Sequence, residues 1–308
     1  MKRIAYFGVV LGVAMMGNLW AAEQKEPTTE EVGKMEAAAP KEARVKPEKK
    51  RKLLVYSVSW EYWHDSIPYG KKVVQILGEK TGAFETIVSD DPRMFEAETL
   101  KQFDAVLFNN TNNEIFLPEN FEKLTGDTGA RERAKALDQD ARLKKSLVVF
   151  LQQGGGLAVI HAGVASFREW PEFGEIIGAR FTNHPWVSGS TVTLKVDEPG
   201  HALAGAFKEG TFTIRDEIYQ VGDPYSREKL RVLLSIDTVK TNMKVQGIAR
   251  KDGDFAMGWI KSYGKGRVFY NALGHDHDIF WNPMVLQHWL DGLQFVLGDL
   301  KADMKPSK

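Results

Sequence analysis

Short apolar runs alternate with amphipathic stretches through the first half of the chain. The segments 53–57, 84–89, 104–109 and 157–160 have strand length and are rich in apolar residues, which is typical of strands buried on both faces of a sheet. Residues 66–80 instead place apolar side chains at helical spacing. Strands that alternate with helices predict right-handed crossovers and a parallel sheet.

In the second half the pattern changes to an alternation of apolar and polar residues. Residues 191–196 and 212–219 predict half-exposed strands that add antiparallel to one side of the sheet. Residues 255–260 and 267–273 flank a Tyr-Gly-Lys-Gly turn, which indicates a hairpin. A last helix is predicted over residues 283–297. The fold class is therefore α/β, a mostly parallel sheet flanked by helices, with added antiparallel strands.

A charged segment interrupts the parallel half. Residues 118–145 have few apolar positions, so we expect an exposed helical excursion there rather than sheet material. This segment is expected to lead into an apolar helix over about 143–153, ended by the three glycines at 154–156. A further short helix is expected near residues 172–177.

The N-terminal residues have the pattern of a secretory signal peptide. A basic start precedes an apolar run over residues 4–16, and Ala21 and Ala22 offer small residues for cleavage. The run is too short for a membrane span of ~20 residues, and no later segment supplies one. We therefore expect a signal peptide over residues 1–22 and a soluble protein that is periplasmic or secreted.

The next segment, residues 23–52, is rich in Glu, Lys, Ala and Pro and has almost no large apolar residues. Because such a composition cannot offset the entropy lost on ordering, it predicts a disordered linker. The folded domain is then expected over residues 53–300.

The composition of the 308-residue chain is that of an ordinary globular protein, with 43% hydrophobic and 27% charged residues. Equal counts of 41 basic and 41 acidic residues give no bias toward nucleic acid, so no nucleic-acid partner is expected. The absence of cysteine excludes disulfides, thiolate metal sites and cysteine nucleophiles. Catalysis must then use His, Asp, Glu, Ser, Tyr or Lys.

Three of the seven histidines directly follow predicted strands. These are His64, His161 and His275, and His184 lies in a loop beside Pro185. Because parallel strands bring such loops to one edge of the sheet, the four side chains can converge there. We therefore expect them to hold a divalent metal, with zinc as the first candidate and manganese, nickel or iron as alternatives. The plainer alternative for each is a hydrogen-bonded structural histidine.

Glu217, at the end of an alternating strand, adds a carboxylate to this group. A carboxylate beside imidazoles or a metal can have a pKa tuned for proton transfer, so His161, Glu217 and His275 are the predicted catalytic residues. Asp276 is expected to orient the ring of His275. The alternative for Glu217 is solvation of a strand end.

Aromatic residues crowd the same loops. Trp63, Trp170, Trp186 and Tyr219 are the predicted substrate-binding residues, because a sugar can stack its C–H faces on a ring while its hydroxyls bind polar side chains. The alternative is that these rings are bulky lids packed over a helix end.

Five ordered motifs resemble those of a known family. They are His161-Ala162-Gly163 after a Gly-Gly-Gly strand, His184-Pro185, Asp216-Glu217-Ile218-Tyr219, the run from Gly264 to Tyr270, and Gly274-His275-Asp276. With these motifs, residues 53–298 are similar to the trehalose-utilisation, ThuA-like family.

The resemblance implies a flavodoxin-like sheet related to class I glutamine amidotransferases and a role linked to carbohydrates. Amidotransferase chemistry is not carried over, because it needs a cysteine nucleophile. We expect an exported enzyme that acts on a sugar, a 3-keto sugar or a glycoside by metal-assisted or His/Glu-assisted proton transfer, in an isomerisation, elimination or hydrolysis. The alternative is a non-catalytic carbohydrate-binding or accessory protein. Association into a homo-oligomer is left open.

Overall fold

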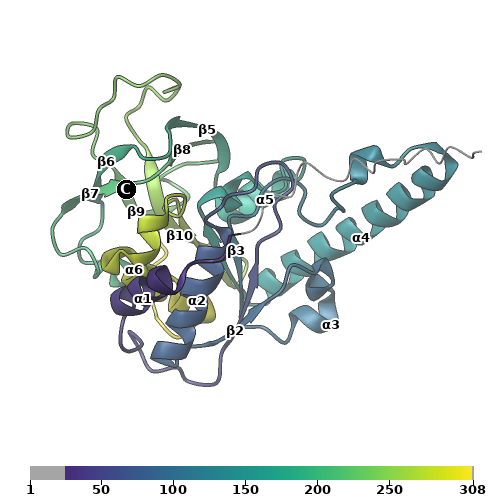
Figure 1. Cartoon of the computed structure of the whole chain (residues 1–308), viewed down its shortest axis with the longest axis horizontal. Coiled ribbons are helices and arrows are strands. Elements are labelled where there is room, and N and C mark those ends of the chain that lie inside the picture. Colours follow the sequence, from purple (N-terminus) through teal and green to yellow (C-terminus); the bar gives the residue numbers. More distant parts are fainter. Residues whose placement is uncertain (1–24, 307–308) are drawn as a thin grey trace, which may run out of the picture.

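The computed structural model of this protein describes residues 25–306, so the predicted signal peptide over residues 1–22 lies outside the described part of the chain. The described residues form a nine-stranded mixed sheet with helices on both faces and a smaller two-stranded sheet (Figure 1). No helix in this part of the chain has the length and apolar character needed to cross a membrane.

Five parallel strands form one half of the large sheet, in the spatial order β2-β1-β3-β4-β11. Counted along the chain, they are the second, first, third, fourth and fifth parallel strands, which is the flavodoxin-like order. The predicted α/β flavodoxin-like fold is confirmed. The strands span Lys52–Tyr56 (β1), Glu85–Val88 (β2), Ala105–Asn109 (β3), Gly156–Ile160 (β4) and Gly266–Asn271 (β11).

Four antiparallel strands extend the sheet beyond β11. The alternating pattern predicts β6 and β7 but not β9, and the predicted strand over 212–219 is divided between β7 and β8 of the small sheet. β10 and β11 form the predicted hairpin, and its Gly264 has a φ of 58°, a conformation that favours glycine. These strands span Ala256–Tyr263 (β10), Arg231–Ile236 (β9), Thr191–Val196 (β6) and Thr211–Arg215 (β7). β5 (Arg180–Trp186) and β8 (Ile218–Gly222) pair with each other in the small sheet.

Helices cover both faces of the large sheet (Figure 1). α2 and α6 pack on one face, with α1 against α2, while α4 and α5 lie on the opposite face. The α-helices span Thr29–Ala38 (α1), Ile67–Thr81 (α2), Ala97–Leu100 (α3), Gly126–Gln152 (α4), Pro171–Ile177 (α5) and Pro283–Leu297 (α6). Short 3-10 helices span Pro92–Phe95 (η1), Phe121–Lys123 (η2), His161–Ala165 (η3), Ala202–Ala204 (η4) and His277–Trp281 (η5).

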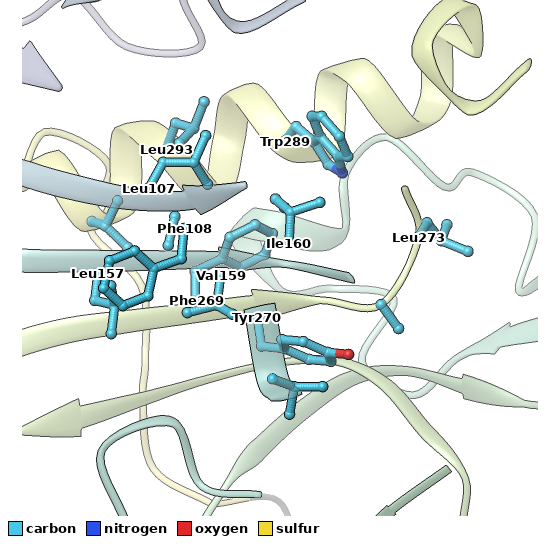
Figure 2. Close-up of a cluster of buried hydrophobic side chains, with 14 of the residues drawn as sticks. Leu107, Phe108, Leu157, Val159, Ile160, Phe269, Tyr270, Leu273, Trp289 and Leu293 are labelled. Atoms are coloured by element: carbon cyan, nitrogen blue, oxygen red, sulfur yellow. The ribbon is translucent and has the colours of Figure 1, made fainter. Parts of the chain in front are cut away.

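The centre of the core lies where α6 crosses β4 and β11. Figure 2 shows Trp289 and Leu293 of α6 over one face of these strands and Tyr270 on the other. Gly156 permits the close approach, because a Cβ at this position would lie 2.1 Å from the carbonyl oxygen of Val296. The strands that carry site loops at their carboxyl ends are therefore fixed by packing on both faces.

The charged segment and the apolar helix that follows it are one continuous helix, α4, of 27 residues. The predicted helical excursion thus runs into the predicted apolar helix without a break, because no helix-breaking residue divides the run of Ala, Arg, Lys and Glu residues from the apolar turns. Leu143, Leu147 and Leu151 anchor its C-terminal half in the core. Its N-terminal half extends away from the sheet (Figure 1).

The prediction of a disordered linker does not hold for residues 25–52. This segment contains α1, which begins with a capping box between Thr28 and Glu31. Met35 and Ala39 are buried against the core, and the Tyr69 hydroxyl donates to Glu31 at 2.9 Å. A few apolar contacts at helical spacing are therefore enough to order a segment whose average composition is polar.

We predict that Met35→Ala lowers the free energy of unfolding by about 2 to 4 kcal/mol, because it removes a fully buried side chain and leaves a cavity. Leu137→Ala, at an exposed position of α4, is the control and should cost about 0.5 kcal/mol or less. Urea denaturation of both variants measures the difference. Equal effects would contradict the packing of α1 on the domain.

Candidate active site

The histidines that follow β1, β4 and β11 converge at the carboxyl edge of the sheet. The ring centroids of His64 and His161 are 5.3 Å apart, those of His64 and His275 are 5.3 Å apart, and those of His161 and His275 are 5.4 Å apart. The three imidazoles thus stand at the corners of a nearly equilateral triangle. Parallel strands end at one edge, so this meeting follows from the topology.

Glu217 closes the cluster from the link between β7 and β8. Its Oε2 lies 3.4 Å from Nε2 of His161 and 3.7 Å from Nε2 of His275. The other oxygen, Oε1, lies 3.1 Å from Nδ1 of His184. One ligand atom from each of His64, His161, Glu217 and His275 lies within 4.8 Å of all the others, which is a spacing that could surround a metal ion.

His161 stands at a sharp bend between β4 and η3. Its φ of 47° is in the left-handed region, which costs a residue other than glycine about 1 to 3 kcal/mol. Nδ1 lies 2.7 Å from the carbonyl oxygen of Ala272. Because a carbonyl only accepts, Nδ1 carries the proton, and Nε2 is left buried without a hydrogen-bond partner among the described residues.

A carboxylate holds the ring of His275. Its Nδ1 lies 3.1 Å from Oδ1 of Asp276, which also accepts from the Ser188 hydroxyl at 2.6 Å, while Oδ2 accepts from the Gly189 N–H at 2.8 Å. Burial opposes ionisation of Asp276, but these three donors outweigh it and hold its pKa below the ordinary value. Asp276 therefore orients the ring as expected, and Nε2 of His275 faces Glu217.

His64 is buried beside Tyr219 and Tyr62. Its Nε2 lies 3.3 Å from the Tyr219 hydroxyl, and its Nδ1 has no hydrogen-bond partner within the part of the chain that the structure describes. The Tyr62 ring stands edge-on to the imidazole at 4.7 Å between centroids. Tyr219 also contacts His161, at 4.3 Å between ring centroids.

The electrostatics of the cluster favour the neutral form of two of its imidazoles, those of His64 and His161. Burial, together with repulsion from the other imidazoles, lowers the pKa of His64 well below its usual value. Burial also lowers the pKa of His161, against the pull of Glu217. Burial opposes ionisation of Glu217, yet attraction to His161 and to the other neighbouring imidazoles outweighs it and holds the pKa of Glu217 below the ordinary value. Neutral imidazole and carboxylate are the forms that bind a metal.

Asn110, at the end of β3, joins three of the loops that form the site. It is fully buried and has a φ of 53°. Its Nδ2 donates to the carbonyl oxygen of Gly274 at 3.0 Å and to the hydroxyl of Ser66 at 3.2 Å, and its Oδ1 accepts from the N–H of Ala162 at 3.2 Å. The loops that carry His64, His161 and His275 are therefore tied to a single side chain.

Asp216 holds the same turn from the other side. Its buried carboxylate accepts the backbone N–H groups of Gly274 at 2.8 Å, His275 at 3.1 Å and Asp276 at 2.7 Å. Because Asp216 directly precedes Glu217, these bonds also fix the distance between Glu217 and His275. Sequence reasoning missed the role of Asn110; the usable signal was the preference of Asn for left-handed positions at a strand end.

His184 differs from the other predicted metal ligands. It lies within β5 rather than in a loop, and its side chain is 47% exposed. It contacts Oε1 of Glu217 but does not belong to the four residues whose ligand atoms are mutually close. The fourth member of that group is Glu217, and the half-exposed His184 lies at the edge of the cluster.

The predicted substrate-binding aromatic residues do not share one surface. Tyr219 contacts the cluster, and Trp63 is half-buried in the loop next to His64. Trp186 is buried against Phe255 and donates its indole N–H to Asn242. Trp170 packs against Phe167 and Phe173. Neighbouring aromatic rings pack against Trp170 and Trp186. These contacts favour the alternative given for these two residues, a packing role rather than sugar binding.

We predict that Asn110→Asp destabilises the site, because it replaces the donor to Gly274 by a charged acceptor facing a carbonyl. The free energy of unfolding should fall by about 2 to 4 kcal/mol, and amide exchange over residues 272–276 should accelerate. Asn113→Asp is the control, since Asn113 also has a positive φ but its side chain makes no hydrogen bond to the described residues. Equal exchange in the two variants would contradict the role given to Asn110.

Solved structures share this fold at low sequence identity. A ThuA-like protein from Bacteroides uniformis has a TM-score of 0.57 and 19% identity, over 82% of this chain and 94% of its own. For a ThuA-like protein from Parabacteroides merdae the TM-score is 0.51 at 15% identity, over 81% and 91% of the two chains. For a cytoplasmic protein from Salmonella typhimurium it is 0.50 at 12% identity, over 80% and 98%. At such identities the likeness concerns the fold alone.

Sequence comparison identifies the family directly. No curated protein matches the chain. The family described as ThuA, trehalose utilisation, matches residues 52–296, which include every residue of the cluster. The resemblance seen in the five motifs is confirmed, and the chain belongs to the ThuA trehalose-utilisation family.

Proposed function

We propose that this protein is a carbohydrate-converting enzyme that binds a divalent metal ion through His64, His161 and His275 and uses Glu217 for proton transfer. The observation that carries the proposal is the cluster itself, three imidazoles with ring centroids 5.3 to 5.4 Å apart beside one carboxylate. Buried polar atoms in a structural core normally have partners, whereas Nδ1 of His64 and Nε2 of His161 have none among the described residues.

The donor atoms fit a metal ion. The proton on Nδ1 of His161 and the carboxylate on Nδ1 of His275 leave both Nε2 atoms as lone-pair donors facing Glu217. The lone pair on Nε2 of His161 lies 3.4 Å from the Glu217 carboxylate, a repulsion that a metal ion bound by the imidazoles, or a proton between the two atoms, would relieve. Nδ1 of His64 supplies a third nitrogen. Such nitrogen and oxygen donors suit zinc first, with manganese, nickel or iron as alternatives.

The residues of the cluster then have separate roles. When bound, the metal would polarise a carbonyl or hydroxyl group of the substrate. Glu217 places a carboxylate oxygen beside the imidazoles of His161 and His275 and can accept a proton from the substrate as a general base. Its Oε1 faces His184, whose half-exposed ring passes the proton toward solvent. Proton transfer of this kind serves isomerisation, elimination or hydrolysis of a sugar, a 3-keto sugar or a glycoside.

Two further parts of the proposal rest on the sequence. The family description, trehalose utilisation, supports a carbohydrate substrate. A periplasmic or secreted location is supported by the N-terminal pattern of basic, apolar and small residues.

The metal part of the proposal predicts about one equivalent of zinc per chain after loading and dialysis, measured by elemental analysis. His161→Ala and His275→Ala should each weaken zinc binding at least tenfold, because each removes a ligand. The control is His277→Ala, since His277 stacks on Tyr69 at 3.9 Å between ring centroids and lies outside the cluster. Loaded wild-type protein that retains no metal would overturn the assignment.

The catalytic part predicts that Glu217→Gln lowers kcat on a 3-keto glycoside about a hundredfold to ten-thousandfold, because it removes the base. Glu209→Gln, an exposed carboxylate before the start of β7, should leave kcat unchanged. Product formation followed by chromatography measures both. If metal-loaded wild type forms no product from any 3-keto glycoside tested, the enzyme proposal fails and the non-catalytic binding alternative takes its place.

A further inference from the structure

A cavity of about 530 Å³ lies at the carboxyl edge of the sheet, and none of the cluster residues lines it. Its walls come from Trp60 after β1, Pro92 after β2, the loop 115–119 after β3, and α4. In this strand order the direction of winding reverses between β1 and β3, where doubly wound sheets bind ligands. The volume is within the range of roughly 300 to 1,000 Å³ common for small-molecule sites.

The protruding half of α4 forms the outer wall of this cavity. Glu132, Lys135, Ala136 and Gln139 line it, and their spacing of three and four residues places them on one face of the helix. The neighbouring Leu137 does not line it and is 49% exposed. The charged N-terminal half of α4, which extends away from the core, thus forms one wall of this cavity.

Trp60 lies in the loop that also carries His64 of the cluster. Its indole N–H donates to the carbonyl oxygen of Leu117 at 2.9 Å, which fixes the ring, and the residue remains 38% exposed. Two residues further along the same loop, the Tyr62 ring stands 4.7 Å from His64. Because consecutive Cα atoms are 3.8 Å apart, Trp60 and Tyr62 are separated by at most about 7 Å. The cavity and the cluster are therefore bordered by the same short loop after β1.

The lining of the cavity selects the chemistry of its ligand. Trp60, Phe116 and Pro118 present apolar surface, while Glu119, Glu132, Lys135 and Gln139 provide acceptors and donors. The carboxylate of Asp90 is paired with Lys71 at 2.6 Å, so two carboxylates remain against one ammonium group. This excess of negative charge disfavours phosphates and uronic acids. Apolar faces with scattered hydrogen-bonding groups suit a neutral sugar ring.

We propose that this cavity binds the second ring of a neutral disaccharide or oligosaccharide whose first ring lies at the cluster of His64, His161, Glu217 and His275. The inference rests on the proposed carbohydrate function and names the size of its substrate. Trp60 supplies the stacking face, and α4 supplies hydrogen-bonding groups and closes the outer side.

The test compares two tryptophan substitutions one residue apart on α4. Ala136→Trp fills the cavity, whereas Leu137→Trp adds the same side chain beside it. Calorimetry on the full chain, with zinc and after EDTA treatment, measures binding of trehalose, maltose, cellobiose, lactose and glucose. Ala136→Trp and Trp60→Ala should weaken the disaccharide that binds wild type by at least tenfold, with glucose unchanged. Leu137→Trp should match wild type, and Trp60→Phe should recover part of the loss.

The possible results separate this inference from the proposed catalysis. If Ala136→Trp binds every disaccharide as wild type does, or if wild type binds none of them at millimolar concentration, the second-ring site is overturned. If Ala136→Trp and Trp60→Ala lose disaccharide binding while no variant shows turnover, the sugar site stands and the catalytic proposal fails. Thermal unfolding that matches wild type shows that the variants are folded.

Discussion

Both backbone polar groups of Gly274 are held by buried side chains, and the geometry of the site depends on this constraint. Its N–H donates to Asp216, while its carbonyl oxygen accepts from Asn110 and from Ser66. Without these bonds the turns after β1, β4 and β11 would be separate loops with their own mobility. Three imidazoles are held together beside a carboxylate, and this arrangement leaves two buried nitrogen atoms without partners in the described chain.

Much of this arrangement follows from the sequence, because hydrophobic periodicity and topology determine it. The parallel strands, the hairpin and α6 lie where the pattern predicts them, and His64, His161 and His275 meet because they follow parallel strands. The remaining features depend on tertiary contacts that no local pattern contains. Asn110 acts through partners up to 164 residues away, and the order of α1 depends on the surface that buries Met35.

The same edge of the sheet carries two different environments. The cluster consists of buried imidazoles and a carboxylate whose loops are fixed by hydrogen bonds to the backbone. The cavity beside Trp60 has apolar side chains such as Phe116 and Pro118 in its walls, and α4 forms one side of it. His161 occupies a strained bend after β4, where its φ is 47°. The bend presents the unpartnered Nε2 of its imidazole to the cluster.

A crystal structure of the zinc-loaded protein, with diffraction data collected on both sides of the zinc absorption edge, tests the central claim most directly. We predict one anomalous peak, bonded to Nε2 of His161, Nε2 of His275 and Nδ1 of His64 at distances of about 2.0 to 2.1 Å. The loops around Gly274 should keep the positions described above. A cluster without an anomalous peak, with His161 and Glu217 in direct hydrogen bond, would contradict the account.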